Sequence, residues 1–247
     1  MGIDKLNQER LFLNQLDYGD HVGDEPYLVL KRKYVHHLAQ IVLRGDALEL
    51  GCSDGFMTKL IADSVSTLDV VDASESNIDL AKNNAPANAT FYEALFEEFE
   101  PKKQYDVVIA SYIFEHILEV PLILKKIYSW IKPNGILFAV VPNCRALSRQ
   151  LALKLNFITD LKELTPNDLK SGHRRVYDTH SFNKDITECG FKIVNQGGLI
   201  FKILADFQLN QLLENGFFNE EHIEGLFQLG LEYPDFADSM FVIARKQ

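Results

Sequence analysis

The stretch 47–55, Ala-Leu-Glu-Leu-Gly-Cys-Ser-Asp-Gly, combines residue types that suit the binding of a nucleotide-like ligand. Glycine has no Cβ, so Gly51 lets the backbone approach a ligand, and Gly55 lets the following helix begin close to the strand. Free N–H groups at such a helix start face the ligand. Asp72 ends a second apolar run, at the distance where an acid accepts hydrogen bonds from ribose hydroxyls. These residues predict a site for a ligand that carries a ribose.

The spacing of the glycines separates two classes of ligand. A dinucleotide turn has the pattern G-x-G-x-x-G, whereas this chain has E-x-G-x-x-x-G from Glu49 to Gly55. That pattern resembles the first motif of class I S-adenosylmethionine-dependent methyltransferases, and Val-Asp-Ala-Ser at 71–74 resembles their acidic ribose-binding step. The resemblance continues in order through Leu-Phe-Glu-Glu-Phe at 95–99, Tyr-Asp-Val-Val-Ile at 105–109, Phe-Glu-His-Ile at 114–117 and Leu-Phe-Ala-Val-Val-Pro-Asn at 137–143. A dehydrogenase on a similar sheet is disfavoured by the glycine pattern.

The elements that must position these residues alternate as an α/β sheet requires. We expect strands near 46–51, 67–72, 90–93, 105–111, 136–141, 191–197 and 239–244, and helices near 4–16, 26–43, 56–65, 75–84, 116–131, 180–189, 202–214 and 219–230. The resemblance implies a Rossmann-like, doubly wound, seven-stranded mixed sheet with its last strand antiparallel between the fifth and sixth. We interpret 1–247 as a single domain with an N-terminal helical cap at 1–44. An insertion at 142–180, with amphipathic stretches at 145–157 and 161–169, would cover the methyl acceptor.

The resemblance implies S-adenosylmethionine as cofactor, bound at the carboxyl ends of the strands. The expected cofactor-binding residues are Glu49, Gly51, Cys52, Asp54, Gly55, Asp72, Ala73, Leu95, Phe96, Ser111 and Tyr112. Leu95 and Phe96 would flank the adenine, while Ser111 and Tyr112 fall where the chain passes the methionine part. Many relatives carry an acid where Leu95 stands, so recognition of the base is left to backbone groups or to Glu97.

Methyl transfer is an in-line displacement in which the protein positions donor and acceptor and removes a proton from a hydroxyl acceptor. His173 is the candidate general base, because it lies in the insertion and follows Gly172, which gives the backbone freedom to turn it inward. Tyr177 would orient His173 or touch the acceptor. His116 is the alternative base, or a ligand-orienting or structural group bonded to Glu49.

Glu115 and His116 also raise the question of a metal. In the ubiquinone-biosynthesis O-methyltransferases a similar Glu-His pair, with another acid one turn earlier, is associated with a divalent cation. That earlier position is Tyr112 here. Two ligands do not make a site for a hard cation, so we predict no metal.

The insertion is rich in groups that suit an anionic acceptor. Arg145, Arg149, Arg174, Arg175 and Asn143 are the candidate substrate-binding residues, since guanidinium groups recognise carboxylate and phosphate in a bidentate manner. The alternative is that these arginines pair with acids at 160, 163, 168 and 178 on the surface. The Gly-His-Arg-Arg-Val-Tyr-Asp segment at 172–178 resembles methyltransferases of surface-glycan and specialised-metabolite pathways. The predicted function is methyl transfer to an O or N atom of a small anionic metabolite, such as a sugar, nucleotide sugar or specialised metabolite; the alternative is a noncatalytic S-adenosylmethionine or S-adenosylhomocysteine binding module.

Composition narrows the partners and the compartment. The net charge is −10 and the pI near 5.2, which argues against binding to a nucleic-acid backbone. The chain has an odd number of cysteines, Cys52, Cys144 and Cys189, without a C-x-x-C pair, which fits a reduced compartment better than a disulfide framework. The sequence starts without an apolar signal core and has no apolar run of membrane-spanning length, so we expect a cytoplasmic protein without a membrane partner. A homodimer is possible, and residues 17–25 are a candidate flap over the cofactor or a plain loop.

Overall fold

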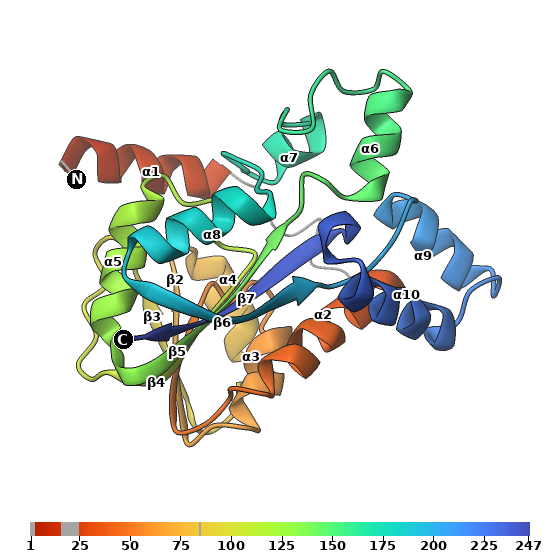
Figure 1. The fold of residues 1–247 in the computed structure, drawn as a ribbon. Helices are drawn as coiled ribbons and strands as arrows, with labels where there is room; N and C mark the ends of the chain where they lie inside the picture. Colours follow the sequence, from red (N-terminus) through yellow and green to blue (C-terminus); the bar gives the residue numbers. More distant parts are fainter. Residues whose placement is uncertain (1–2, 16–24, 84) are drawn as a thin grey trace.

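The computed structural model describes residues 3–15, 25–83 and 85–247, and its centre is a sheet of seven strands (Figure 1). The strands are β1 (Asp46–Leu50), β2 (Thr67–Asp72), β3 (Ala89–Glu93), β4 (Tyr105–Ser111), β5 (Ile131–Pro142), β6 (Phe191–Gly198) and β7 (Ser239–Lys246). Their order is β3-β2-β1-β4-β5-β7-β6, with β7 antiparallel to both of its neighbours and the other pairs parallel. The predicted doubly wound mixed sheet, with its last strand antiparallel between the fifth and sixth, is confirmed.

Helices cover both faces of the sheet (Figure 1). The helices are α1 (Ile3–Gln15), α2 (Pro26–Ala39), α3 (Phe56–Ala62), α4 (Glu75–Lys82), α5 (Val120–Trp130), α6 (Leu147–Lys154), α7 (Pro166–Lys170), α8 (Thr179–Glu188), α9 (Asp206–Glu214) and α10 (Glu220–Glu232), with a 3-10 turn at Pro234–Phe236. One core lies between the sheet and α2, α3, α4, α9 and α10, and the other lies between the sheet and α5 and α8. The segment that carries α6 and α7 follows β5 and projects from its end.

Local side chains set where the elements begin. Ser74 starts α4 by accepting a hydrogen bond from the Asn77 N–H, and α7 and α8 begin at capping boxes. In the second of these boxes Asp178 accepts from the Ser181 N–H at 2.7 Å. These caps satisfy N–H groups that a helix start otherwise leaves without a partner.

Two boundaries differ from the prediction and matter for the site. The helix expected from residue 116 begins only at Val120, with Pro121 in its first turn, so His116 lies in a loop. The fifth strand begins at Ile131 because that residue pairs with Tyr105 before the register shifts. Residues 132–135, which precede the strand expected at 136–141, are therefore an irregularity within β5.

Other expectations lie partly outside the described residues. Of the candidate flap at 17–25, only Glu25 is described. Within the described ranges, none of the helices combines the length and the apolar character that crossing a membrane requires.

Candidate functional site

The glycine turn after β1 has the backbone that its sequence predicts. Gly51 and Gly55 both have left-handed φ values, 77° and 79°, which side-chain-bearing residues rarely adopt. The Gly51 N–H donates to the Val71 carbonyl at 2.8 Å, which ties the turn to the end of β2. A Cβ on Gly55 would lie 2.7 Å from Cα of Ala81, so this glycine lets α3 start against α4 rather than against β1.

Asp72 holds the turn and the next helix together. Its Oδ2 accepts from the Cys52 N–H and its Oδ1 from the Ser74 N–H, each at 2.9 Å. A carboxylate offers about four acceptor sites, so both oxygens keep capacity for hydroxyl donors. The side chain lies beside the left-handed glycine backbone at the carboxyl edge of the sheet, where the ribose is predicted to bind. The residues present therefore fit the nucleoside part of S-adenosylmethionine.

Glu49 is a buried acid beneath the same turn. Its Oε2 accepts from the Thr58 hydroxyl at 2.6 Å. Burial, with the nearby charges of Asp72 and Asp54, raises the pKa of Glu49 to about 8, so the carboxyl group is mostly protonated at neutral pH. The suggestion that Glu49 bonds His116 is wrong, because Glu49 bonds Thr58 and His116 lies in another cluster.

The turn is also joined to the N-terminal cap. Asp54 accepts from the Phe56 N–H at 3.0 Å through Oδ1, and its Oδ2 pairs with the Arg32 guanidinium at 2.6 Å. Arg32 stacks over the Phe56 ring as well, with its guanidinium carbon 4.5 Å from the ring centroid. The sequence analysis did not predict this pair, because α2 and the turn are brought together only by the fold.

The loops after β3 and β4 place the remaining predicted cofactor residues. Leu95 is buried and its carbonyl accepts from two backbone N–H groups, while Phe96 and Ala73 are partly exposed. The Ser111 Oγ is buried with no hydrogen-bond partner among the described residues. Tyr112 has a φ of 58°, and its hydroxyl donates to Ser239 Oγ at 3.0 Å. Ser111 is the last residue of β4 and Tyr112 follows it, and their contact with the methionine part of the cofactor stays a prediction.

A buried polar network beside Tyr112 was missed by the sequence analysis. Lys31 pairs with Asp238 at 2.8 Å and lies 5.0 Å above the Tyr112 ring. The Tyr27 hydroxyl donates to the same Asp238 oxygen at 3.0 Å. Tyr27 and Lys31 are one helical turn apart, but only the tertiary structure brings them to Asp238, the residue before β7.

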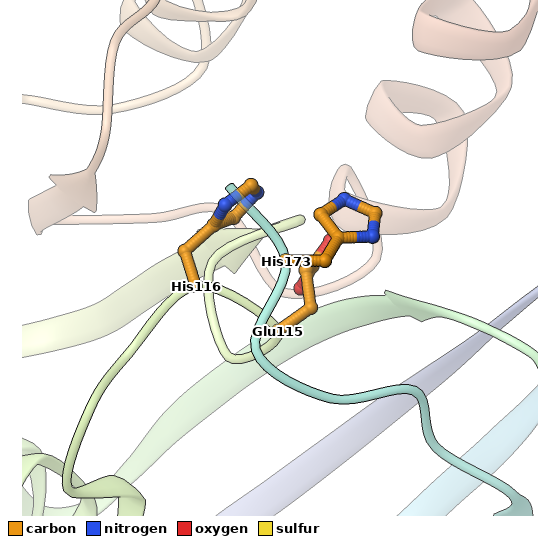
Figure 2. A group of neighbouring side chains, drawn as sticks. All are labelled: Glu115, His116 and His173. Atoms are coloured by element: carbon orange, nitrogen blue, oxygen red, sulfur yellow. The ribbon is translucent and has the colours of Figure 1, made fainter. Parts of the chain in front are cut away.

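Glu115, His116 and His173 form the second centre of the site (Figure 2). One ligand atom of each lies within 4.8 Å of the others, and the two imidazole rings meet edge to face with centroids 4.8 Å apart. Figure 2 shows Glu115 and His116 on the loop after β4 and His173 on the segment of the insertion that crosses it. The two predicted catalytic histidines are therefore neighbours.

The surroundings give the two histidines different properties. Asp168 Oδ1 lies 3.1 Å from His173 Nδ1, and hydrogen bonds from Thr165 and Arg149 help to hold the pKa of this carboxyl below its usual range. His173 therefore donates from Nδ1 to the Asp168 carboxylate, which leaves Nε2 as the second ring nitrogen. Burial, together with His173, lowers the pKa of His116 to about 3, so His116 is neutral and a weak base. Burial also raises the pKa of Glu115 to about 7.

Tyr177 and Asn143 hold the insertion in place. The Tyr177 hydroxyl donates to Asp185 at 3.2 Å, so Asp168, and not Tyr177, orients His173. The Asn143 amide donates to two carbonyls in the segment before β7, and its oxygen accepts from the Arg145 N–H. Both side chains, predicted as acceptor contacts, are buried and engaged within the protein.

The arginines of the insertion do not form one anion site. Arg149 pairs with Asp168 at 3.0 Å, which is one of the ion pairs of the alternative, although this pair is mostly buried and does not lie on the surface. Arg174 donates from Nη2 to both carboxylate oxygens of Glu9 in α1 and from Nε to the His116 carbonyl. Arg175 donates to backbone carbonyls of the 114–118 loop. Arg145 is exposed and makes no ion pair with any described residue.

Comparison with known proteins agrees with this geometry. A family model described as a methyltransferase domain matches residues 27–196. The chain is 30% identical to a malonyl-[acyl-carrier protein] O-methyltransferase of Halalkalibacterium halodurans, over 56% of this chain and 55% of the relative. It is 24% identical to a ubiquinone biosynthesis O-methyltransferase of Rickettsia canadensis, over 70% and 74% of the two chains. The alignment thus spans about half the length of the first relative.

The fold has solved counterparts of nearly the same length. The N-methyltransferase NodS from Bradyrhizobium japonicum, in complex with S-adenosylhomocysteine, superposes with a TM-score of 0.61 at 12% identity, covering 98% of this chain and 97% of that one. At that identity the likeness concerns the fold alone. The family model, which covers well over half of the residues, shows that the chain belongs to the methyltransferase domain family, among the class I S-adenosylmethionine-dependent methyltransferases.

Proposed function

We propose that this chain transfers the methyl group of S-adenosylmethionine to an oxygen or nitrogen atom of a small metabolite. The observation that carries the proposal is the Asp72 carboxylate, which joins the glycine turn to the start of α4 and keeps acceptor capacity for ribose hydroxyls. The curated relatives are named as O-methyltransferases, which favours oxygen as the accepting atom. When bound, the cofactor supplies an activated methyl group on its sulfonium.

The residues of the chain then have two tasks, to position the acceptor and to take its proton. Asp72 and the Gly51 backbone hold the nucleoside, while Ser111 and Tyr112 flank the methionine part. His173 is the better proton acceptor of the two histidines, because Asp168 fixes its orientation, whereas the lowered pKa of His116 makes that ring a weak base.

The test of the activity is a product search. The purified chain, S-adenosylmethionine and pools of cell metabolites are incubated, and mass spectrometry detects products heavier by one methyl group in place of a hydrogen. Calorimetry with S-adenosylmethionine, S-adenosylhomocysteine and NAD separates the rival classes. A chain that binds only NAD would contradict the proposal, and one that binds the cofactor without any product would be the noncatalytic module.

Replacing His173 by Ala tests the proton step. Positioned general-base help contributes about 10²–10⁴-fold, so kcat for a hydroxyl acceptor should fall by about that factor. The affinity for S-adenosylmethionine should stay within a few-fold. His180→Ala is the matched control, since His180 is an exposed histidine on α8. A near-normal kcat in His173→Ala would contradict the general-base role of His173. A large loss of kcat in His116→Ala alone would assign that role to His116.

We further propose an anionic acceptor, now with Arg145 as its main support. This guanidinium is exposed next to the end of β5, whereas Arg149, Arg174 and Arg175 bond within the protein. Arg145→Ala should raise the KM of a carboxylate- or phosphate-bearing acceptor and leave kcat nearly unchanged. A neutral acceptor, or an unchanged KM, would contradict this assignment.

A further inference from the structure

We propose that Glu115, His116 and His173 form a binding site for one divalent transition-metal ion, with the third ligand supplied by the insertion. The absence of a metal was predicted because only Glu115 and His116 were counted as ligands. The fold adds His173 from a distant part of the sequence, so the three side chains together offer two imidazole nitrogens and one carboxylate oxygen.

Glu115 gives the first argument. It is completely buried, and neither of its carboxylate oxygens has a hydrogen-bond partner among the described residues. A buried polar atom without a partner costs free energy, and a buried charge costs more unless it is paired or bound to a metal. A cation between Glu115 and the histidines would satisfy these oxygens.

The surroundings of His173 give the second argument. A histidine that binds a metal through one ring nitrogen commonly donates its other N–H to a carboxylate, which fixes the ring and increases its basicity. Asp168 plays this part for His173 at 3.1 Å from Nδ1, and Arg149 and Thr165 hold Asp168 in turn. With Nδ1 engaged by Asp168, Nε2 is the ring nitrogen left to bind an ion.

The distances and charges are compatible with an ion. Ligands about 2.0–2.2 Å from a tetrahedral ion lie about 3.4 Å from one another, and the present ligand atoms lie within 4.8 Å. Side-chain rotations that move the ligand atoms by about an ångström would bring them to these distances. Arg174 and Arg175 bring positive charge near the loop, but both donate to its backbone carbonyls and Arg174 is paired with Glu9.

The donor set selects the class of ion. Imidazole suits zinc, copper, iron, cobalt and nickel, whereas magnesium and calcium prefer oxygen ligands. Two nitrogens and one carboxylate leave a coordination position open for water or another ligand. His173 Nε2 cannot hold an ion and accept a proton at once, so its proton-acceptor role belongs to the metal-free protein.

The test is metal binding by the untagged full-length chain, since a polyhistidine tag would itself bind metal. After treatment with a chelator and dialysis, the chain is titrated with Co²⁺ and its visible absorption is followed, and Zn²⁺ is then added as competitor. We expect one ion per chain. Glu115→Gln, His116→Ala and His173→Ala should each weaken binding at least about 10-fold, and Asp168→Asn should weaken it about 10–100-fold.

His180→Ala is the control and should bind Co²⁺ as the unaltered chain does. Circular dichroism and the affinity for S-adenosylmethionine show whether each variant keeps its fold. The proposal would be overturned if the chain bound no Co²⁺ at micromolar concentration, or if all three ligand variants bound Co²⁺ as the unaltered chain does. The titration contains neither cofactor nor acceptor, so its failure is distinct from a failure of methyl transfer.

Discussion

At the scale of single residues, the acids of the glycine turn have divided tasks. Asp72 accepts from two backbone N–H groups, whereas the buried Glu49 accepts from the Thr58 hydroxyl beneath the turn. Both carboxyl groups lie at the glycine turn, and they have different tasks: Asp72 is proposed to contact the ligand, whereas Glu49 holds the fold.

Asp72→Ala should weaken the binding of S-adenosylmethionine at least ~10-fold, because hydrogen bonds to charged groups contribute about 1.5–3 kcal/mol each. The substitution also releases the N–H groups of Cys52 and Ser74, which loosens the turn. Calorimetry measures the effect. Asp79→Ala, which removes an exposed acid from α4, is the control and should bind normally. Equal affinity in the two variants would exclude the ribose role of Asp72.

Glu49 predicts a pH dependence of stability. Its pKa is about 8 in the folded protein, above the ordinary 4.5, so the folded state binds more protons between these values. The free energy of unfolding contributed by this group is therefore full below about pH 4.5 and is lost as the pH rises toward 8. Glu49→Gln keeps a partner for Thr58 without the ionisation. The stability difference between Gln variant and wild type, measured by urea unfolding, should shift by a few kcal/mol in favour of Gln across this range. A stability difference that does not change with pH would contradict the raised pKa of Glu49.

At the scale of elements, the most buried ion pair of α1 joins this helix to the insertion. Glu9 pairs with Arg174, whose guanidinium also lies 4.2 Å from the Phe12 ring centroid and donates to the His116 carbonyl. The first helix is thereby connected to the loop that carries one of the site histidines.

Arg174→Met should release α1 from the body of the protein. Removing one partner of a buried pair costs about 3–5 kcal/mol, but undocking of the helix limits this cost by returning Glu9 to water. Hydrogen exchange should therefore increase in residues 3–15 while β1 and β4 stay protected. Arg10→Met removes the exposed pair with Glu98 and is expected to have little effect. Similar exchange in both variants would mean that the Glu9 pair does not hold α1.

The elements also show what the sequence could predict. The strands and the glycine turn follow from local patterns, namely apolar runs, glycine spacing and a strand-end acid. The start of α5 was placed four residues early because the apolar residues before Pro121 continue the helical pattern. The pairs Asp168–His173, Lys31–Asp238 and Arg174–Glu9 depend on how loops cross in space, and residue types alone give no distance between them.

At the scale of the whole molecule, the cofactor should stabilise the folded state by mass action. At 100 times its Kd a ligand adds about 2.7 kcal/mol, and for a chain of this size each kcal/mol raises Tm by about 2–4 °C. S-adenosylmethionine should therefore raise Tm by about 5–11 °C. NAD should give no shift, and Asp72→Ala should lose most of the shift at the same cofactor concentration. Scanning calorimetry measures these Tm values. A rise in Tm with NAD but not with S-adenosylmethionine would contradict S-adenosylmethionine as the cofactor.

The position of β7 has a consequence for how the chain is made on the ribosome. β7 lies between β5 and β6, and within the sheet β6 pairs only with β7. Tyr27 of α2 likewise bonds Asn210 and Asp238, near the other end of the chain. Until residues 239–246 leave the exit tunnel, β5 therefore keeps an open edge and β6 has no place in the sheet. A nascent chain held at that stage exposes pairing edges that invite aggregation, so the last strand completes the sheet and the attachment of α2 in one late step.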